Sequence, residues 1–372
     1  MDSPRSFRKL KNKILILFFA SLFALPRFSV EESTSCMNCH INPTGAGMRN
    51  DHGTNVYNLD ELTIRKWISE GDEDWDGFIT DHIQIGGEFR IQSFDGNESS
   101  GTFPMQAEIY TKVDINKKTD FYLETSLGGS NNYEYFILFN KLPKKGWVKI
   151  GQSSPNYGLI IDDHTSFIKS GNKNSLDLDN SVLDRGFRDL FNPLGSKPLI
   201  VEGGFKFLKN LYMTVSLFQP LSEGYQENLS SLSGSISYIN NFGSTSLMLG
   251  SSILEENDIS LMGIFGGLSF KDFTMMFEAD LAENLFDGIE SSLASYAQLT
   301  YKPVQGLHLI AKYDYFDHNY EFSSGSIARY SYGFEIYPFN MLEVKVQSRI
   351  YAADGIDLEL DSEYLVQVHT WF

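Results

Sequence analysis

The sequence predicts an all-β protein: a transmembrane antiparallel β-barrel of about sixteen strands (between about fourteen and eighteen), preceded by a short N-terminal segment. Three observations predict this class. Strand-length runs that alternate apolar and polar residues fill the chain from residue 82 to residue 372. Short connections alternate with longer, acidic, Gly/Ser-rich ones. The chain is 14% aromatic, yet its mean hydropathy is only -0.22, so the two kinds of residue must be finely interleaved.

Composition also excludes several classes of protein. The 372 residues carry a formal net charge of -18, which makes nucleic acid an improbable partner. Two cysteines rule out a disulfide scaffold. No Ser/His/Asp triad or catalytic carboxylate pair stands out, so the sequence favours a redox or transport protein over a hydrolase or transferase.

Residues 1–29 are predicted to be an export signal. Basic residues precede an apolar run at 14–25, which ends at Pro26. This run is too short to span a bilayer as a helix, which takes about 20 residues, and it is typical of a signal peptide. An uncleaved anchor would need a longer run. We expect cleavage between Ala24 and Val30, and hence an exported protein.

The barrel is expected over residues 82–372. In residues 342–350, for example, apolar side chains alternate with Glu343, Lys345, Gln347 and Arg349, so one set faces lipid and the other faces a hydrated lumen. The sixteen expected strands begin near residues 82, 103, 120, 131, 146, 197, 210, 233, 244, 257, 272, 291, 305, 328, 342 and 361.

The connections and the C-terminus distinguish a membrane barrel from a soluble sandwich, whose strands alternate in the same way. Short turns such as LKN and KPVQG are followed by long loops such as DHNYEFSSGSI, the pattern of an outer-membrane barrel. The last strand places alternate residues up to Phe372 on one face, and this ending resembles the recognition signal of bacterial outer-membrane barrels.

The strongest chemical motif lies in residues 30–81, as Cys36-Met-Asn-Cys39-His40. In c-type haem attachment, two thiols form thioethers with the haem vinyl groups and the adjacent histidine binds iron. A thioredoxin-like redox pair would need a βαβ context, and a zinc site would need four ligands. Because these are the only cysteines and they follow an export signal, the motif predicts one covalent haem c.

Two stretches resemble bacterial outer-membrane porins that carry one covalent haem c, the fused cytochrome–porin type. The first is CMNCHINPTGAGMRNDHG from Cys36, and the second is GLIIDDHTSF from Gly158. The resemblance implies a haem segment on the periplasmic side or in the barrel lumen. It also implies electron transfer at the outer membrane, with periplasmic redox carriers or other cytochromes as partners.

The sixth iron ligand is left open by the sequence. His52 and Met48 are the main candidates, with His82 within reach. Two imidazoles give a lower reduction potential than imidazole with thioether. Alternatively, the iron is five-coordinate or takes a ligand from the barrel. Gly45, Gly47 and Gly53 are expected to let the backbone pass close to the porphyrin.

The longest stretch without a strand pattern is residues 153–196, which is expected to fold into the lumen as a pore loop. A metal site at Asp162, Asp163 and His164 is one interpretation of its polar residues, and a loop held by hydrogen bonds and salt bridges is the more frequent one. The candidate lining residues are Asp162, Asp163, His164, Arg185 and Arg188.

Two functions are therefore expected from the sequence. In the first, the haem-bearing barrel takes part in electron transfer across or at the outer membrane. In the second, the barrel is a passive diffusion porin for small ions or solutes, and the haem segment is a plug, a sensor or an assembly element.

Overall fold

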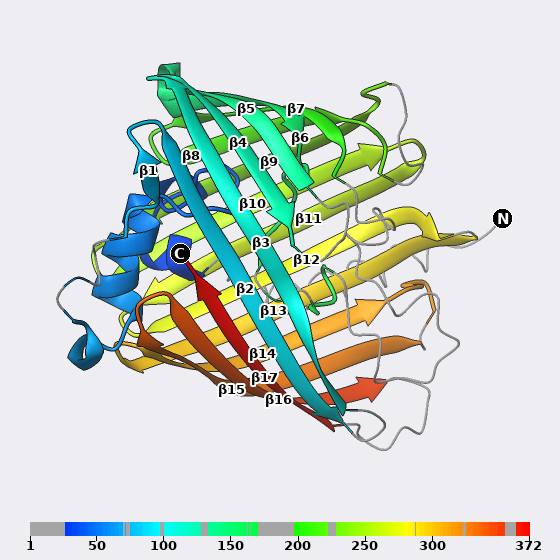
Figure 1. The fold of residues 1–372 in the computed structure, drawn as a ribbon. Coiled ribbons are helices and arrows are strands. Elements are labelled where there is room, and N and C mark those ends of the chain that lie inside the picture. The colour runs from blue at the N-terminus through cyan, green and yellow to red at the C-terminus, as the bar shows by residue number, and fades with distance from the viewer. Residues whose placement is uncertain are drawn as a thin grey trace.

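The computed structural model describes residues 27–69, 71, 75–96, 100–127, 133–161, 163, 165–169, 197–221, 228–286, 288–322, 325–353 and 362–372. Its architecture is one antiparallel sheet closed into a barrel, with further chain segments inside (Figure 1).

Sixteen strands form the closed wall. They are β2 (Ile83–Gly96), β3 (Ser100–Asn116), β4 (Thr119–Ser126), β5 (Tyr133–Leu142), β6 (Gly146–Gln152), β7 (Leu199–Leu208), β8 (Leu211–Phe218), β9 (Ser231–Asn241), β10 (Thr245–Glu256), β11 (Ile259–Phe270), β12 (Phe273–Phe286), β13 (Ile289–Val304), β14 (Leu307–Asp317), β15 (Ser326–Phe339), β16 (Leu342–Ala353) and β17 (Ser362–Trp371). Each strand pairs with the next, and β17 pairs with β2 to close the barrel.

The predicted fold class is confirmed. The largest difference between an expected and an observed strand start is at the second strand, which was expected near residue 103 and begins at Ser100. One strand was not predicted. β1 (Phe78–Thr80) precedes the barrel and pairs with the start of β2, with Thr80 opposite Ile83. It is only three residues long, too short to show alternation.

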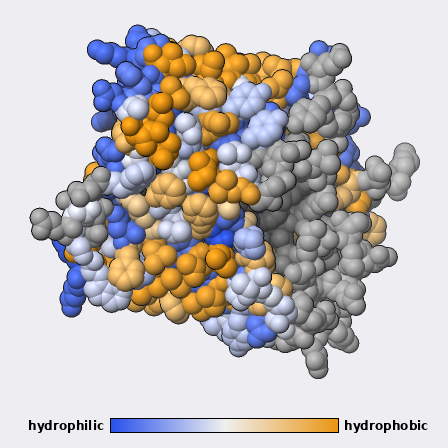
Figure 2. All heavy atoms as spheres, viewed as in Figure 1, coloured by the Kyte–Doolittle hydropathy of each residue, from blue (hydrophilic) through white to orange (hydrophobic). Residues whose placement is uncertain are grey.

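The two faces of the wall differ as the alternation predicts. On β16, Glu343, Lys345, Gln347 and Arg349 are buried inside the barrel. On β17, Tyr364, Val366 and Val368 are 61%, 43% and 42% exposed on the outer face, where apolar residues gather over the strands (Figure 2). An apolar outer face of this extent would be unfavourable in water and suits contact with lipid.

The N-terminal segment lies at the end of the barrel that holds the C-terminus and the short turns (Figure 1). It is built from short helical pieces: α2 (Arg27–Glu31), η1 (Cys36–Asn38), η2 (His52–Val56), η3 (Asn58–Leu62) and η4 (Arg65–Trp67). We call residues 27–69 the floor segment. A further short helix, η5 (Pro143–Lys145), is the turn between β5 and β6.

A second segment enters the lumen after β6. Its described residues, 153–161, 163 and 165–169, contact strands on the other side of the barrel; for example, the Tyr157 hydroxyl donates to Asp280 Oδ1 on β12 at 3.0 Å. We call these residues the roof loop. Within the part of the chain that the structure describes, no helix is long and apolar enough to cross a membrane.

Candidate functional site

The Cys-x-x-Cys-His motif forms one tight turn. η1 begins at Cys36, and the backbone N–H groups of Cys39 and His40 both donate to the Cys36 carbonyl oxygen, at 3.1 Å and 3.0 Å. Two residues between the cysteines are therefore enough to bring both thiols and the imidazole to one side of the chain. Both thiols are free.

The next residues form a loop that folds back on this turn. His40 and Arg49 make an isolated β-bridge, and between them Gly45, Ala46 and Gly47 have φ angles of 98°, 62° and 62°. Glycine is favoured in this left-handed region because it has no Cβ. A Cβ at residue 45 would also lie only 3.2 Å from Cys36 Sγ. The glycine therefore lets the loop pack directly on the thiol.

His40 is held with one ring nitrogen toward the backbone. Its Nδ1 lies 3.4 Å from the Gly47 carbonyl oxygen, which accepts a hydrogen bond from the Nδ1–H tautomer. Histidines that bind metals commonly donate their other N–H in this way. Burial, with a smaller contribution from Arg49, lowers the pKa of His40 to about 4. The ring is therefore neutral near pH 7, which is the form that binds iron.

The cysteine thiols are also in their uncharged form. Burial raises the pKa of Cys39 to about 11 and raises the pKa of Cys36. Neither thiol is a reactive thiolate in this setting, which disfavours a thiol–disulfide exchange pair.

The motif opens into a cavity of about 280 Å³ inside the barrel. We call this cavity the chamber. Its volume is near the lower limit of small-molecule sites, which range from roughly 300 to 1,000 Å³. Three parts of the chain line it: the floor segment with Cys36, Cys39, His40, Gly45 and Gly47; the roof loop with Ile160, Ile161, Asp163 and Lys169; and the wall with Glu88, Arg90, Met276, Tyr296, Lys312, Glu335, Glu343, Lys345 and His369.

Buried polar contacts hold the floor segment to the wall. Arg27 Nη2 forms an ion pair with Glu335 Oε2 at 2.5 Å and donates to the Tyr337 hydroxyl at 2.7 Å. Asn42 Nδ2 donates to Glu134 Oε1 at 3.2 Å, and the Thr274 hydroxyl donates to Glu31 Oε1 at 2.9 Å. These contacts reach several strands and fix the floor segment across the lumen.

The roof loop is held by its backbone as well as by side chains such as Tyr157. The N–H groups of Asn156, Leu159 and Phe167 donate to Glu202 Oε2, Glu278 Oε2 and Asp314 Oδ1, at 2.9 Å, 2.7 Å and 3.2 Å. These three carboxylates lie on β7, β12 and β14. The loop therefore crosses the lumen from one part of the wall to another.

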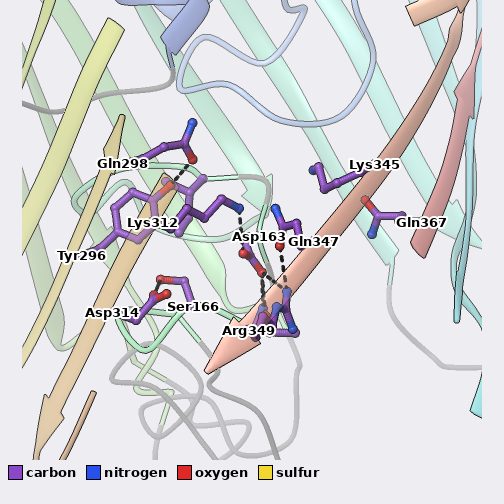
Figure 3. Close-up of polar contacts among 12 residues, drawn as sticks. Asp163, Ser166, Tyr296, Gln298, Lys312, Asp314, Lys345, Gln347, Arg349 and Gln367 are labelled. Carbon is purple, nitrogen blue, oxygen red and sulfur yellow. Dashed lines mark hydrogen bonds and ion pairs between the residues drawn. The ribbon is translucent and has the colours of Figure 1, made fainter. Parts of the chain in front are cut away.

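Two charged groups of the roof loop that the structure describes line the chamber: Asp163, and Lys169, whose Nζ donates to the Ile161 carbonyl oxygen at 3.1 Å. The Oδ2 of Asp163 lies 2.9 Å from Lys312 Nζ, and its Oδ1 lies 3.7 Å from Arg349 Nη2 (Figure 3). Because both oxygens of Asp163 are paired with cations, these contacts favour a structural ion-pair network at this residue over a metal site. Asp162, His164, Arg185 and Arg188, the other predicted pore-loop residues, lie outside the described residues.

The two main candidates for the sixth iron ligand lie away from the chamber lining. His52 begins η2, and its Nε2 is buried without a hydrogen-bond partner in the described part of the chain. Met48 is buried against the wall, in a cluster with Tyr110, Tyr122 and Phe136. Gly53 lines the chamber, and a Cβ there would lie 2.4 Å from the Cys39 carbonyl oxygen.

The donor set fits a haem attached through two thioethers. Two uncharged thiols and a neutral imidazole line one cavity, and this is the chemistry that the attachment needs. Among the residues that the structure describes, no group of three or more His, Cys, Asp or Glu side chains is placed to hold a metal ion.

Sequence reasoning predicted the motif but missed much of the chamber wall. Glu88, Met276, Glu335 and His369 were not singled out, although each occupies an inward position of an alternating strand. Alternation gives the face of each side chain. It does not show which inward side chains lie at the same height in the barrel.

Solved structures show what this architecture is similar to. An outer-membrane protein of Vibrio cholerae, OmpT with loop L8 deleted, has a TM-score of 0.55 at 11% identity, over 78% of this chain and 99% of that one. The chain has the fold of an outer-membrane porin. The anion-selective porin from Comamonas acidovorans has a TM-score of 0.54 at 10% identity, over 78% and 99%. The outer-membrane channel DcaP of Acinetobacter baumannii has a TM-score of 0.53 at 12% identity, over 80% and 99%.

Sequence comparisons add no closer assignment. No protein-family model matches the chain, and no curated protein matches it. At 10–12% identity the porin likeness establishes the fold alone.

Proposed function

We propose that this protein is an outer-membrane barrel that carries one covalent haem c, bound through Cys36, Cys39 and His40, and takes part in electron transfer at or across the outer membrane. The observation that carries the proposal is the position of the motif. Both thiols and the imidazole face a chamber inside the lumen, between the floor segment and the roof loop.

The membrane location rests on the outer face of the barrel. Exposed apolar side chains cover the strands, and the fold is that of outer-membrane porins. The predicted export signal supplies the route to that membrane. The partners that follow are outer-membrane lipid, periplasmic redox carriers or other cytochromes, and small ions or solutes.

A haem inside the barrel would shorten the distance that electrons must travel across the membrane. The hydrocarbon layer is about 30 Å thick, so a haem at the periplasmic mouth alone would leave most of the distance uncrossed. A haem in the chamber divides this distance. Electrons would enter through the floor segment at the short-turn end, where a periplasmic carrier can dock.

The haem supplies a one-electron Fe(III)/Fe(II) couple, and the chain's residues set its surroundings. His40 would bind the iron through Nε2, while the Gly47 carbonyl oxygen orients the ring through Nδ1. Asn42 and Met48 pack the attachment loop against the wall, which limits water around the attachment. Glu335 and Glu343 both pair with Lys345, and Glu335 also pairs with Arg27, so two carboxylates and two cations lie together beside the chamber.

The alternative is a diffusion porin in which the haem segment serves as a plug, a sensor or an assembly element. The polar lumen and the likeness to porins and channels favour this alternative. The two functions differ in whether removal of the haem alters electron transfer or only conductance.

A haem-free variant separates them. Cys36→Ala with Cys39→Ala should abolish the c-type α-band in the reduced-minus-oxidised spectrum of purified outer membranes, and electron transfer through proteoliposomes should fall to background. Single-channel conductance in a planar bilayer is measured on the same preparation. Unchanged electron transfer with retained conductance would contradict the conduit and support the porin.

A further inference from the structure

We propose that Met276 of β12 is the second axial ligand of the haem iron. The inference rests on the proposed function, because it assumes that Cys36, Cys39 and His40 bind a haem in the chamber. It adds a residue from the barrel wall to the haem site.

Met276 lies at the height of the chamber. Two residues before it, the Thr274 hydroxyl donates to Glu31 Oε1 of the floor segment at 2.9 Å. Two residues after it, Glu278 Oε2 accepts the Leu159 N–H of the roof loop at 2.7 Å. Inward side chains of a strand recur every second residue, so Met276 is the inward side chain between these two contacts. It is 5% exposed and lines the chamber.

Met276 also comes from a different part of the wall than the one beside His40. Arg49, which bridges His40, stacks on the Trp371 ring of β17 at 4.6 Å and lies 3.9 Å from Glu88 Oε2 on β2. Five strands, β13 to β17, separate β12 from β2 along the shorter way round the barrel. His40 and Met276 nevertheless line the same chamber, so a group bound in it would lie between these two parts of the wall.

Three other nitrogen-bearing side chains that line the chamber lie beside buried carboxylates. His369 has Nε2 at 2.8 Å from Glu88 and Nδ1 at 2.9 Å from Glu343. Lys312 pairs with Asp163 at 2.9 Å, and Lys345 pairs with Glu335 at 3.2 Å. Iron binding by any of these side chains would leave a buried carboxylate without its partner, which is strongly unfavourable.

A thioether avoids this cost. It is uncharged and polarisable, and it is a known axial ligand of haem iron. Among the described side chains that line the chamber, Met276 is the only thioether. Met276 is also part of an apolar cluster, with Tyr157 and Leu159, but it lines the chamber, whereas Met48 and His52 do not. Histidine–methionine ligation raises the reduction potential above that of two histidines.

The test uses the full-length protein, matured with haem in a bacterial host and purified from the outer membrane. The wild-type ferric protein should be six-coordinate and low-spin, with the near-infrared charge-transfer band of a methionine–iron bond. Met276→Leu should lose that band, become high-spin and bind carbon monoxide readily once reduced, and its reduction potential should fall. Heat-modifiable mobility on gels checks that each barrel is folded.

Two matched variants sharpen the test. Met275→Leu, one residue away on the lipid-facing side of β12 and 37% exposed, should behave as wild type. Met276→His should restore a low-spin haem without the methionine band and with a lower potential. A methionine band that survives in Met276→Leu, or a wild-type haem that lacks the band, would overturn the assignment. A wild-type protein with no covalent haem would instead overturn the proposed function.

Discussion

The floor segment and the roof loop both cross the lumen, but different atoms hold them in place. The floor segment reaches the wall largely through side chains, such as Arg27 to Glu335 and Asn42 to Glu134. The roof loop combines side-chain contacts, such as Tyr157 to Asp280, with three backbone N–H groups that donate to Glu202, Glu278 and Asp314 on the wall. The first anchoring depends on the identity of the inserted residues, and the second depends more on the carboxylates of the wall.

This difference matches what each segment carries. The floor segment holds Cys36, Cys39 and His40, whose chemistry needs fixed positions. The roof loop, in its described part, contributes Asp163 in an ion-pair network and the apolar side chains of Ile160 and Ile161. We infer that the floor segment determines the cofactor and that the roof loop limits access to it. The predictions below test this division, from the largest expected effect to the smallest.

Removing the floor segment should have the largest effect. Deletion of residues 27–69 takes away every described contact between the Cys-x-x-Cys-His motif and the wall. The wall itself should still close, because β17 pairs directly with β2. Haem should be lost, and single-channel conductance should rise several-fold because the lumen is opened. Unchanged conductance would mean that the floor segment does not restrict the pore.

Lys149→Met should disturb both segments at once. Lys149 Nζ lies 2.8 Å from Glu202 Oε1, with both side chains fully buried, and donates to Asn42 Oδ1 of the floor segment and to Ser153 Oγ of the roof loop. Leaving the Glu202 charge unpaired should lower the free energy of unfolding by about 3–5 kcal/mol, as urea unfolding in lipid vesicles can measure.

A double variant is the control for this substitution. Lys149→Met with Glu202→Gln removes both charges, so part of the lost stability should return. If Lys149→Met alone costs less than about 1 kcal/mol, the pair does not couple the two segments.

Asp163→Asn should affect the roof loop alone. It weakens the contacts with Lys312 and Arg349, and losing a charged hydrogen bond of this kind costs about 1.5–3 kcal/mol. Hydrogen exchange of the roof-loop amides should accelerate, while the haem spectrum stays unchanged. The exposed Glu290→Gln on β13 should alter neither property. A changed spectrum with normal exchange would contradict the division between the segments.

The smallest predicted difference concerns the start of the mature chain. Arg27 and Phe28 both make contacts inside the barrel. Arg27 forms an ion pair with Glu335, and Phe28 packs on the Tyr57 ring with a centroid distance of 5.2 Å. An export signal of residues 1–29 would remove both contacts. We therefore predict cleavage before Arg27, which an intact mass determination can show. A chain that begins at Val30 would mean that the floor segment is held without them.

Much of the wall could be predicted from the sequence because a strand in a barrel obeys one local rule. Glu343, Lys345, Gln347 and Arg349 alternate with apolar residues, and all four are buried in the lumen. The Cys36-x-x-Cys39-His40 motif is equally local, since its geometry needs one turn of chain. Such features can be predicted from the sequence because the residues that define them are close neighbours in the chain.

The chamber could not be predicted because its residues come together only through closure of the barrel. Met276 and His369 are 93 positions apart (369 - 276), and nothing local shows that both line one cavity. Asp163 stood out as part of an Asp-Asp-His run, but its partners Lys312 and Arg349 depend on where the roof loop crosses the lumen. The burial of Met48 against the wall is likewise a tertiary effect.

A density map of the protein purified from the outer membrane would test the central claim most directly. The account predicts porphyrin density joined to the sulfur atoms of Cys36 and Cys39, inside the lumen, with His40 on one face of the ring and Met276 on the other. A disulfide between the two cysteines with no porphyrin in the chamber, or a porphyrin bound outside the barrel, would contradict it.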